Sequence, residues 1–154
     1  TVDLPKSGRI LPKALSIDEV NRLLEMPIEQ SPLRIRNHSM LCLLYSTGLR
    51  VSELVMLPFN SCNLSAEFLR VTGKGNKDRI VPVGRKALAA LQRWRKSRPE
   101  YAPPDEPALF VNNRGSRLSR RSVQARVKHW ARRQGIDTNV FPHLFRHSFA
   151  THLL

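Results

Sequence analysis

The sequence predicts a mainly helical α+β domain that carries a small antiparallel sheet. Several stretches repeat apolar residues at helical spacing, and two short runs of strand-forming residues flank a turn that contains glycines. The length of 154 residues suits one ordinary domain, and a hydrophobic content of 41% is enough for a buried core. No apolar run approaches the ~20 residues that a membrane-spanning helix needs.

The start of the chain is predicted to hold a lead-in and a first helix. Residues 1–15 are interpreted as an extended lead-in or interdomain linker, and residues 16–154 as the domain itself. The tetrapeptide 16–19, Ser-Ile-Asp-Glu, has the pattern of a capping box, in which the first and fourth side chains each bond the other's backbone N–H. Apolar residues then recur at helical spacing until Pro27 ends the helix.

The second predicted helix lies at the centre of the domain. Ser31 and Pro32 suit its N-cap and first position, because proline lacks the N–H that would otherwise go unpaired there. Its run 40–45 is apolar on nearly every side, which is typical of a buried helix. Gly48 provides the C-cap, and a short helix is expected to start at Arg50.

A β-hairpin and a further helix follow. Residues 68–71 and 79–83 have the composition of strands, and the glycine-containing segment 73–78 joins them as a hairpin connection. Residues 87–94 then mark an amphipathic helix that Pro99 stops.

The last third of the chain is predicted to alternate loops with helices. Residues 99–107 are proline-rich and acidic, as expected of a surface loop, and 108–111 suit a third short strand. Residues 123–130 predict a basic helix packed on the core and ended by Gly135. A final helix is expected from about Pro142, and we expect both this helix and the function to continue beyond the last residue. The tryptophans and methionines are expected in the core.

The charge balance points to a polyanionic partner. Twenty-six Lys and Arg against 12 Asp and Glu give a net charge of +14, which favours nucleic acid and leaves an anionic membrane surface open. An aromatic content of 6% argues against a stacking platform for single strands. Two cysteines, Cys42 and Cys62, suit a reduced cytoplasmic protein.

Several kinds of catalytic site are excluded by the residues present. No Cys/His cluster has zinc spacing, no glycine-rich loop leads into Lys-Ser/Thr, and the acidic residues are scattered singly. We therefore expect neither a metal nor another cofactor. Chemistry on a phosphodiester would have to use cations and proton donors.

Arg50 is one candidate, because it follows a glycine at the end of an apolar helix. Its guanidinium could grip two phosphate oxygens at once, which a lysine does less well. The alternative is a cation that meets the helix dipole and pairs with Glu53.

Further candidates lie in the hairpin and near the end of the chain. Lys74 and Lys77 lie in the tight connection, where a lysine could contact a phosphate or donate a proton, although a solvated turn is the simpler interpretation of an isolated hairpin. His143 and Arg146, three residues apart at the start of the final helix, would share one face and favour an anion there. The alternatives are a capping histidine and a solvated arginine.

A set of basic residues is predicted to contact duplex DNA, with a merely solvated face as the alternative. Contacts of this kind bind the phosphate backbone with strong salt dependence and little sequence information. The residues are Lys77, Arg79, Arg117, Arg120, Arg121, Arg126 and Lys128.

Three segments taken together closely resemble the tyrosine recombinases, that is, the phage-integrase family. They are 46–54 (STGLRVSEL), 73–79 (GKGNKDR) and 142–152 (PHLFRHSFATH), and they look most like the XerC/XerD branch, which resolves chromosome dimers. The resemblance covers roughly 15–154 and implies the catalytic-domain fold of that family. The resemblance implies that the family's N-terminal DNA-clamping (core-binding) domain is not part of this chain.

The resemblance implies a role for each matching residue. Arg50 and Arg146 would clamp the scissile phosphate, Lys74 would be the general acid on the leaving 5′ oxygen, and His143 would handle a proton. A later His or Trp and the tyrosine nucleophile are expected beyond this chain, because neither Tyr45 nor Tyr101 matches the nucleophile's surroundings.

The expected activity is site-specific cleavage and rejoining of double-stranded DNA through a 3′-phosphotyrosine, by four subunits on two duplexes, some of which could be a paralogue. The chain by itself is expected to be inactive in cleavage. A non-catalytic duplex-DNA-binding protein is the main alternative, and a basic RNA-binding or ribosomal protein is a third.

Overall fold

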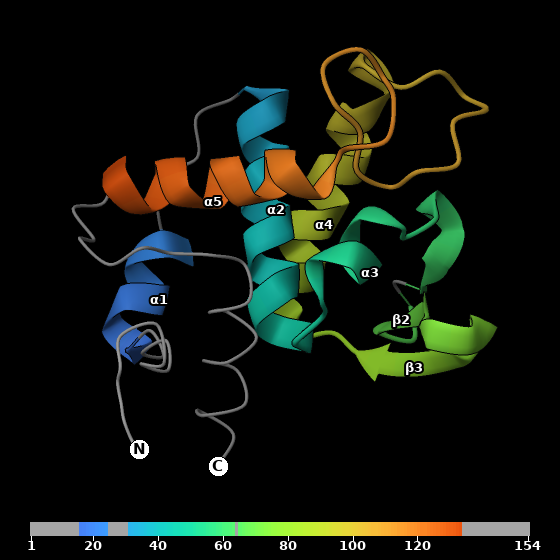
Figure 1. The fold of residues 1–154 in the computed structure, drawn as a ribbon, viewed down its shortest axis with the longest axis horizontal. Helices are drawn as coiled ribbons and strands as arrows, with labels where there is room; N and C mark the ends of the chain where they lie inside the picture. The colour runs from blue at the N-terminus through green and yellow to red at the C-terminus, as the bar shows by residue number, and fades with distance from the viewer. Residues whose placement is uncertain (1–15, 25–30, 64, 134–154) are drawn as a thin grey trace, which may run out of the picture.

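The computed structural model describes residues 16–24, 31–63 and 65–133, in which helices surround a central helix and a small sheet lies to one side (Figure 1). The α-helices are α1 (Ile17–Leu24), α2 (Pro32–Thr47), α3 (Val51–Val55), α4 (Arg85–Ser97) and α5 (Arg120–Arg133). The strands are β1 (Cys62–Asn63), β2 (Phe68–Thr72) and β3 (Asp78–Pro82), and 3-10 turns occupy η2 (Phe59–Ser61), η3 (Lys74–Asn76) and η4 (Arg98–Glu100). The predicted α+β class is confirmed.

Helix α1 begins with the predicted capping box. The backbone N–H of Ser16 donates to Oε1 of Glu19 at 2.9 Å, and the N–H of Glu19 donates to Oγ of Ser16 at 3.0 Å. Two of the helix's initial N–H groups therefore find partners within the first turn. The predicted lead-in 1–15 and the stop at Pro27 lie outside the described residues.

Helix α2 is the buried centre of the domain, as predicted. Ser31 is its N-cap, with extended backbone, and Pro32 takes the first position. Gly48 adopts the left-handed conformation (φ 67°) at the C-cap, and its N–H donates to the Leu44 carbonyl at 3.1 Å. The helix packs along α4, and α5 crosses it (Figure 1). Leu43 is fully buried between these neighbours.

The sheet is antiparallel in the order β1-β2-β3. Strands β2 and β3 form the predicted hairpin, with Phe68 opposite Pro82 at the open end and Thr72 opposite Asp78 at the turn. The hairpin is tied back to α2, because the N–H of Gly84 donates to Oγ of Ser46 at 2.9 Å. The end of the central helix therefore positions the exit of the hairpin.

The core contains most, but not all, of the large side chains expected there. Trp94 and Trp130 are buried, and the indole N–H of Trp94 donates to the Leu109 carbonyl at 2.9 Å. Met40 is buried on α2, whereas Met56 is 60% exposed. Met56 was expected in the core, but it is the C-cap of the short helix α3 and its side chain faces solvent between the buried residues Val55 and Leu57.

The expectation of a strand at 108–111 is wrong. Only isolated bridges form there within the described part, from Ala108 to Pro58 and from Val111 to Arg117. Side chains occupy carbonyls that a strand would offer to a neighbour: Arg98 donates to Ala108 and Leu109, and Trp94 also donates to Leu109. Helix α4 stops at Ser97, and the chain continues through Pro99 as the turn η4.

The basic helix α5 packs on the core as predicted, through Val123, Val127 and Trp130. Its expected end at Gly135 and the final helix from about Pro142 lie outside the described residues. None of the described helices is both long and apolar enough to cross a membrane.

Candidate phosphate-binding site and nucleic-acid interface

Arg50 lies in the tight connection between α2 and α3, where its neighbours fix the backbone. Oγ1 of Thr47 donates to the Leu43 carbonyl at 2.6 Å and accepts the N–H of Leu49 at 3.3 Å. Leu49 is buried, whereas Arg50 is exposed. The backbone N–H of Arg50 donates to Oε1 of Glu53 at 3.0 Å. The backbone is therefore held, and the side chain extends into solvent.

The Arg50 guanidinium forms no ion pair with Glu53 in the described part of the chain. Instead, the Glu53 carboxylate receives Arg79 from β3, with Nη1 to Oε2 at 2.7 Å and Nη2 to Oε1 at 3.1 Å. The alternative interpretation of Arg50, as a cation neutralised by Glu53, is therefore wrong. The hydrogen bond and charge of Glu53 raise the pKa of Arg79 above its ordinary value.

The Glu53–Arg79 pair lies beside the start of the hairpin connection. A methyl group placed on Gly73 would be 3.4 Å from Nη1 of Arg79 and 3.7 Å from Oε2 of Glu53. Gly73 directly precedes Lys74, and its N–H donates to the Lys77 carbonyl at 2.8 Å, which closes the turn. The pair thus joins the helix that follows Arg50 to the strand that follows Lys74.

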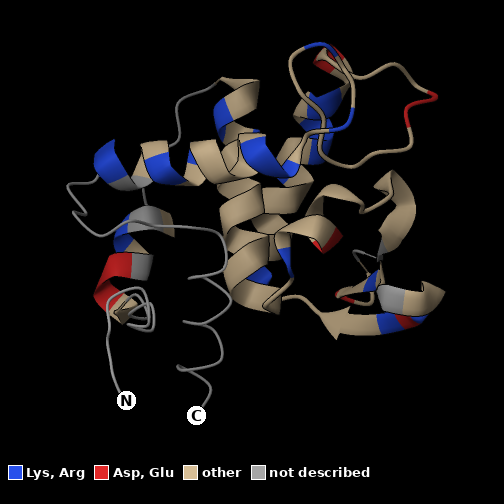
Figure 2. Ribbon diagram, viewed as in Figure 1, with Lys and Arg blue, Asp and Glu red and all other residues tan. Residues whose placement is uncertain are grey.

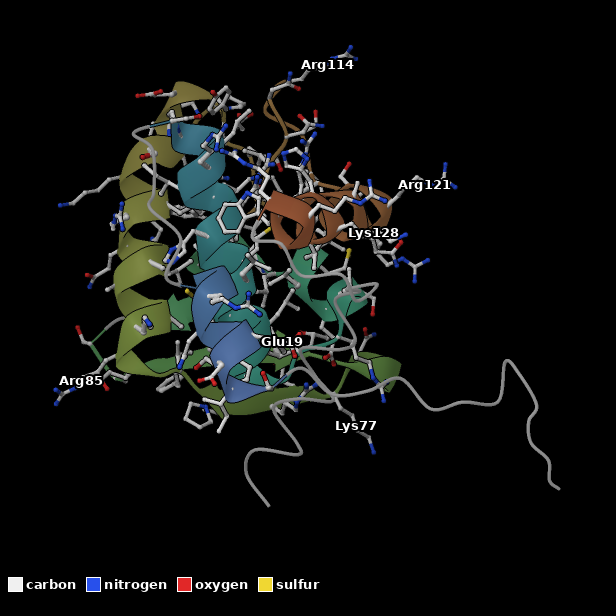
Figure 3. The ribbon with its side chains drawn as sticks, turned by 90° about the vertical axis from the view of Figure 1, so that its left-hand side faces the viewer. Glu19, Lys77, Arg85, Arg114, Arg121 and Lys128 are labelled. Atoms are coloured by element: carbon white, nitrogen blue, oxygen red, sulfur yellow. The ribbon has the colours of Figure 1, made fainter. Side chains whose placement is uncertain are left out.

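The hairpin turn itself presents its residues to solvent. Gly75 (φ 76°) and Asn76 (φ 58°) both adopt left-handed backbone, which allows the chain to reverse in a few residues. Lys77 is exposed and projects away from the sheet (Figure 3). The side chain of Lys74 lies outside the described part, as do His143 and Arg146, so the structure leaves the roles predicted for these three residues untested.

Exposed cations gather along α5 (Figure 2). Arg120, Arg121 and Arg126 are exposed, and Lys128 is partly exposed. Arg121 and Lys128 project to the same side of the molecule as Lys77, whereas the labelled Arg85 of α4 projects to the other side (Figure 3). The structure therefore groups predicted DNA contacts from two separate segments on one side.

Two predicted DNA contacts also hold the fold together. Nη1 of Arg117 donates to the Val55 carbonyl at 2.5 Å, which fixes the loop before α5 against α3. Arg79 is engaged by Glu53, although its side chain is still 45% exposed. Both guanidiniums retain other N–H groups, since each has five.

Sequence reasoning missed two buried arginines, Arg36 and Arg98, which are 4% and 5% exposed. Arg98 donates to the carbonyls of Glu106, Ala108 and Leu109, and its guanidinium lies 4.5 Å from the centre of the Phe59 ring. It therefore shapes the loop that follows η4.

Arg36 lies at the start of α2. Nη1 of Arg36 donates to the Val111 carbonyl at 2.9 Å, and its Nε and Nη2 donate to Oδ1 of Asn37 at 3.1 and 2.8 Å. Burial, together with the charge of Arg126, lowers the pKa of Arg36 from its ordinary value to about 10. A signal was present in the sequence, because Arg36 precedes Met40 by four residues and Leu43 by seven, on the same buried side of the helix.

Two potential nucleophiles on α2, Cys42 and Tyr45, are poorly suited to attack a phosphate. Burial raises the pKa of the Cys42 thiol to about 11, so that this thiol stays protonated at neutral pH. Tyr45 is half-buried on α2, and burial raises its pKa as well. Tyr101 is half-buried beside η4.

Comparison with known proteins places this arrangement among recombinases. The model of the phage integrase family matches residues 13–154. Tyrosine recombinase XerC of Shewanella amazonensis is 48% identical over 154 residues, covering 100% of this chain and 51% of that protein. XerC of Haemophilus influenzae is 47% identical over 153 residues, covering 99% and 51%. The chain spans about half the length of the curated relatives it matches.

Solved recombinase structures share the fold. XerA recombinase superimposes with a TM-score of 0.81 at 30% identity, covering 94% of this chain and 51% of that one. XerH site-specific recombinase bound to a palindromic difH substrate gives a TM-score of 0.80 at 27% identity, covering 95% and 43%. The predicted resemblance is confirmed. Because the family model accounts for nearly all of the sequence and these structures share its fold, the chain belongs to the phage integrase family.

Proposed function

We propose that this chain forms the phosphate-activating part of a tyrosine recombinase, which cleaves and rejoins double-stranded DNA at specific sites. The proposal rests on the conformation and exposure of Arg50. Its backbone is fixed between two helices, while its exposed guanidinium has no hydrogen bond or ion pair within the described residues. A cation held in this way is prepared to bind an anion without reorganisation of the backbone.

The proposed chemistry is transfer of a phosphoryl group from the DNA 5′ oxygen to a tyrosine. The tyrosine oxygen forms a bond to phosphorus, and the bond from phosphorus to the 5′ oxygen breaks. The tyrosine proton passes to His143, and the leaving oxygen receives a proton from Lys74. Arg50 and Arg146 stabilise the negative charge that builds on the non-bridging oxygens. The phosphotyrosine conserves the bond energy, so rejoining requires no nucleotide cofactor or metal.

We propose that the nucleophile lies on a segment outside these 154 residues. Tyr45 is half-buried and its pKa is raised by burial, and Tyr101 is half-buried at the end of η4. Lys77, Arg79 and the cations of α5 are proposed to contact the DNA backbone beside the site.

The relatives support a more specific role. Because the curated relatives are XerC recombinases, we propose that the protein acts in the cytoplasm to resolve chromosome dimers during partition and cell division. We further propose that four subunits act on two duplexes. The XerH structure, which is bound to its difH substrate, supports a DNA partner of this type.

The test is a cleavage assay on a nicked duplex, whose site is first selected by the protein from a random-sequence pool. The readout is a covalent protein–DNA adduct that survives SDS. The 154-residue chain is compared with the longer product of the same gene, and Arg50→Ala is compared with Arg85→Ala, which removes the same charge from the other side of the molecule.

We expect an adduct with the longer product only, and its loss in Arg50→Ala with DNA binding retained. Salt-sensitive binding by both chains without any adduct would contradict the recombinase proposal and favour a DNA-binding module. An adduct formed by the 154-residue chain would contradict our placement of the nucleophile.

A further inference from the structure

A polar cavity of about 390 Å³ lies between the start of α2, the loop before α5 and the first turns of α5. Among the described residues, its lining consists of three arginines, three asparagines, a serine and two leucines, with no acidic side chain. The arginines are Arg36, Arg114 and Arg126. The cavity is therefore strongly positive and rich in hydrogen-bond donors.

The Arg36 charge is buried in the wall of this cavity without a counter-ion. Its partners, the Val111 carbonyl and the Asn37 side-chain amide, are both neutral. No carboxylate lies within ion-pair distance of Arg36 in the described part of the chain. A guanidinium carries five N–H groups, and these bonds use three of them, so two remain for a further acceptor.

A buried cation without a counter-ion is unfavourable, and the nearby charge of Arg126 increases the penalty. An anion in the cavity would relieve both effects. The planar fork of a guanidinium matches the oxygens of a phosphate, and Ser122 and Asn113 offer neutral donors beside it. Among the residues that the structure describes, the lining includes no aromatic ring on which a nucleobase could stack, which favours a phosphate without its base.

We propose that this cavity is a second phosphate-binding site, separate from the Arg50 site, and that it receives a backbone phosphate of the DNA duplex. The identity of the ligand as DNA rests on the proposed function. Ser122 and Arg126 of α5 form one wall of the cavity, and exposed Arg121 lies on the same helix. A DNA strand that follows α5 therefore passes the mouth of the cavity, where Arg114 is also exposed (Figure 3).

The test follows the Nε–Hε resonances of Arg36 and Arg121 by NMR. The 154-residue chain is titrated separately with inorganic phosphate and with a short DNA duplex at constant ionic strength. We expect the Arg36 resonance to shift saturably with both probes and that of Arg121 to shift with the duplex.

Arg126→Ala should weaken binding of both probes about tenfold and lower the slope of log K against log salt for the duplex by about one. The matched control is Arg85→Ala, which removes an exposed arginine on the other side of the molecule (Figure 3). We expect this variant to change either affinity by less than about twofold.

A second variant, Asn37→Asp, distinguishes a phosphate-binding role of Arg36 from a purely structural role. It places a carboxylate 2.8 Å from the Arg36 guanidinium, where the amide oxygen now lies, and so supplies the missing counter-ion internally. We expect a higher melting temperature and loss of the Arg36 response to phosphate, while the Arg121 response to the duplex persists. If Arg36 has only a structural role, its resonance in the wild type does not respond to phosphate, and Asn37→Asp has no response to abolish.

The outcomes distinguish this proposal from the proposed function. A duplex that shifts Arg121 but leaves Arg36 unchanged overturns the second site and leaves DNA binding intact. A response of Arg36 to phosphate alone overturns the assignment to DNA, because the cavity would then take a free phosphate-bearing ligand. If the duplex shifts neither resonance, the proposed function fails together with the second site.

Discussion

Glu53 and Arg79, twenty-six positions apart in the sequence, form a two-pronged ion pair that joins α3 to β3. The same carboxylate accepts the backbone N–H of Arg50. One side chain therefore contacts both the residue proposed to bind the scissile phosphate and the strand that follows the proposed general acid, Lys74. The Glu53 side chain is well shielded from solvent, at 12% exposed, whereas the Arg79 side chain is 45% exposed.

Removal of this pair is expected to impair catalysis far more than stability. Arg79→Ala should lower the free energy of unfolding by less than about 1 kcal/mol, because the guanidinium is partly solvated. It should slow adduct formation by the longer product about tenfold to a hundredfold, because small misplacements of catalytic groups are costly. Urea titration and single-turnover cleavage measure the two effects. Equal rates with and without Arg79 would show that the pair does not position the hairpin.

Arg98 is expected to be essential for the fold, in contrast to its neighbour Arg95. Both guanidiniums lie over the Phe59 ring, at 4.5 and 4.7 Å from its centre. Only Arg98 also donates to buried carbonyls, among them that of Ala108. Arg98→Ala should therefore destabilise the chain by about 2–4 kcal/mol and Arg95→Ala by less than about 1 kcal/mol. Similar urea midpoints for the two variants would contradict this assignment.

His38 is expected to make the chain less stable in mild acid. Burial lowers its pKa below 6.5, and the charges of Arg93 and Lys86 lower it further. The neutral ring donates from Nε2 to the Leu24 carbonyl at 2.6 Å, which joins α2 to α1. Since the unfolded chain binds a proton more readily than the folded one, this stability is fully present above pH 6.5 and is lost as the pH falls from that value through the lower pKa of the folded chain.

The measurement is the free energy of unfolding against pH for the wild type and for His38→Gln, which keeps a donor but does not titrate. The wild type should lose more stability between neutral and mildly acidic pH than the variant does. Parallel curves would show that His38 does not contribute to the acid sensitivity.

Two glycines with similar backbone should respond very differently to a methyl group. Gly75 (φ 76°) has no atom within 4 Å of the added carbon, so Gly75→Ala should destabilise by about 1–2 kcal/mol from backbone strain alone. At Gly115 (φ 81°) the added carbon would lie 2.3 Å from the Tyr101 carbonyl oxygen, so Gly115→Ala should cost more than about 3 kcal/mol. Thermal melts of the two variants test this difference directly.

The parts of the fold that sequence reasoning predicted are those controlled by local chemistry. The capping box at 16–19, Pro32 and Gly48 at the ends of α2, and the hairpin around 73–78 all act through neighbouring residues. The expectation of a strand at 108–111 failed because its carbonyls bind side chains from α4 and η4. No local pattern reveals a competitor from another segment.

The candidate site shows the same contrast between features set by neighbouring residues and features set by tertiary packing. Sequence reasoning placed Arg50 just after the glycine that ends the central helix, and the structure has it there with an exposed side chain. The alternative interpretation, in which Arg50 pairs with Glu53, was wrong because tertiary packing brings Arg79 to this carboxylate. Arg36 was overlooked since arginine is seldom buried without a carboxylate.

The rigidity of α2 has a geometric consequence for any duplex that the domain binds. Arg36 lies near the start of the buried part of this helix, and Thr47 ends the helix three residues before Arg50. At about 1.5 Å per residue, positions 36 and 47 are separated by about 16 Å along the axis. That length equals about five base pairs of B-form DNA at about 3.4 Å each. Since the helix is packed on several sides, a duplex that contacts both ends of α2 has to accommodate this spacing.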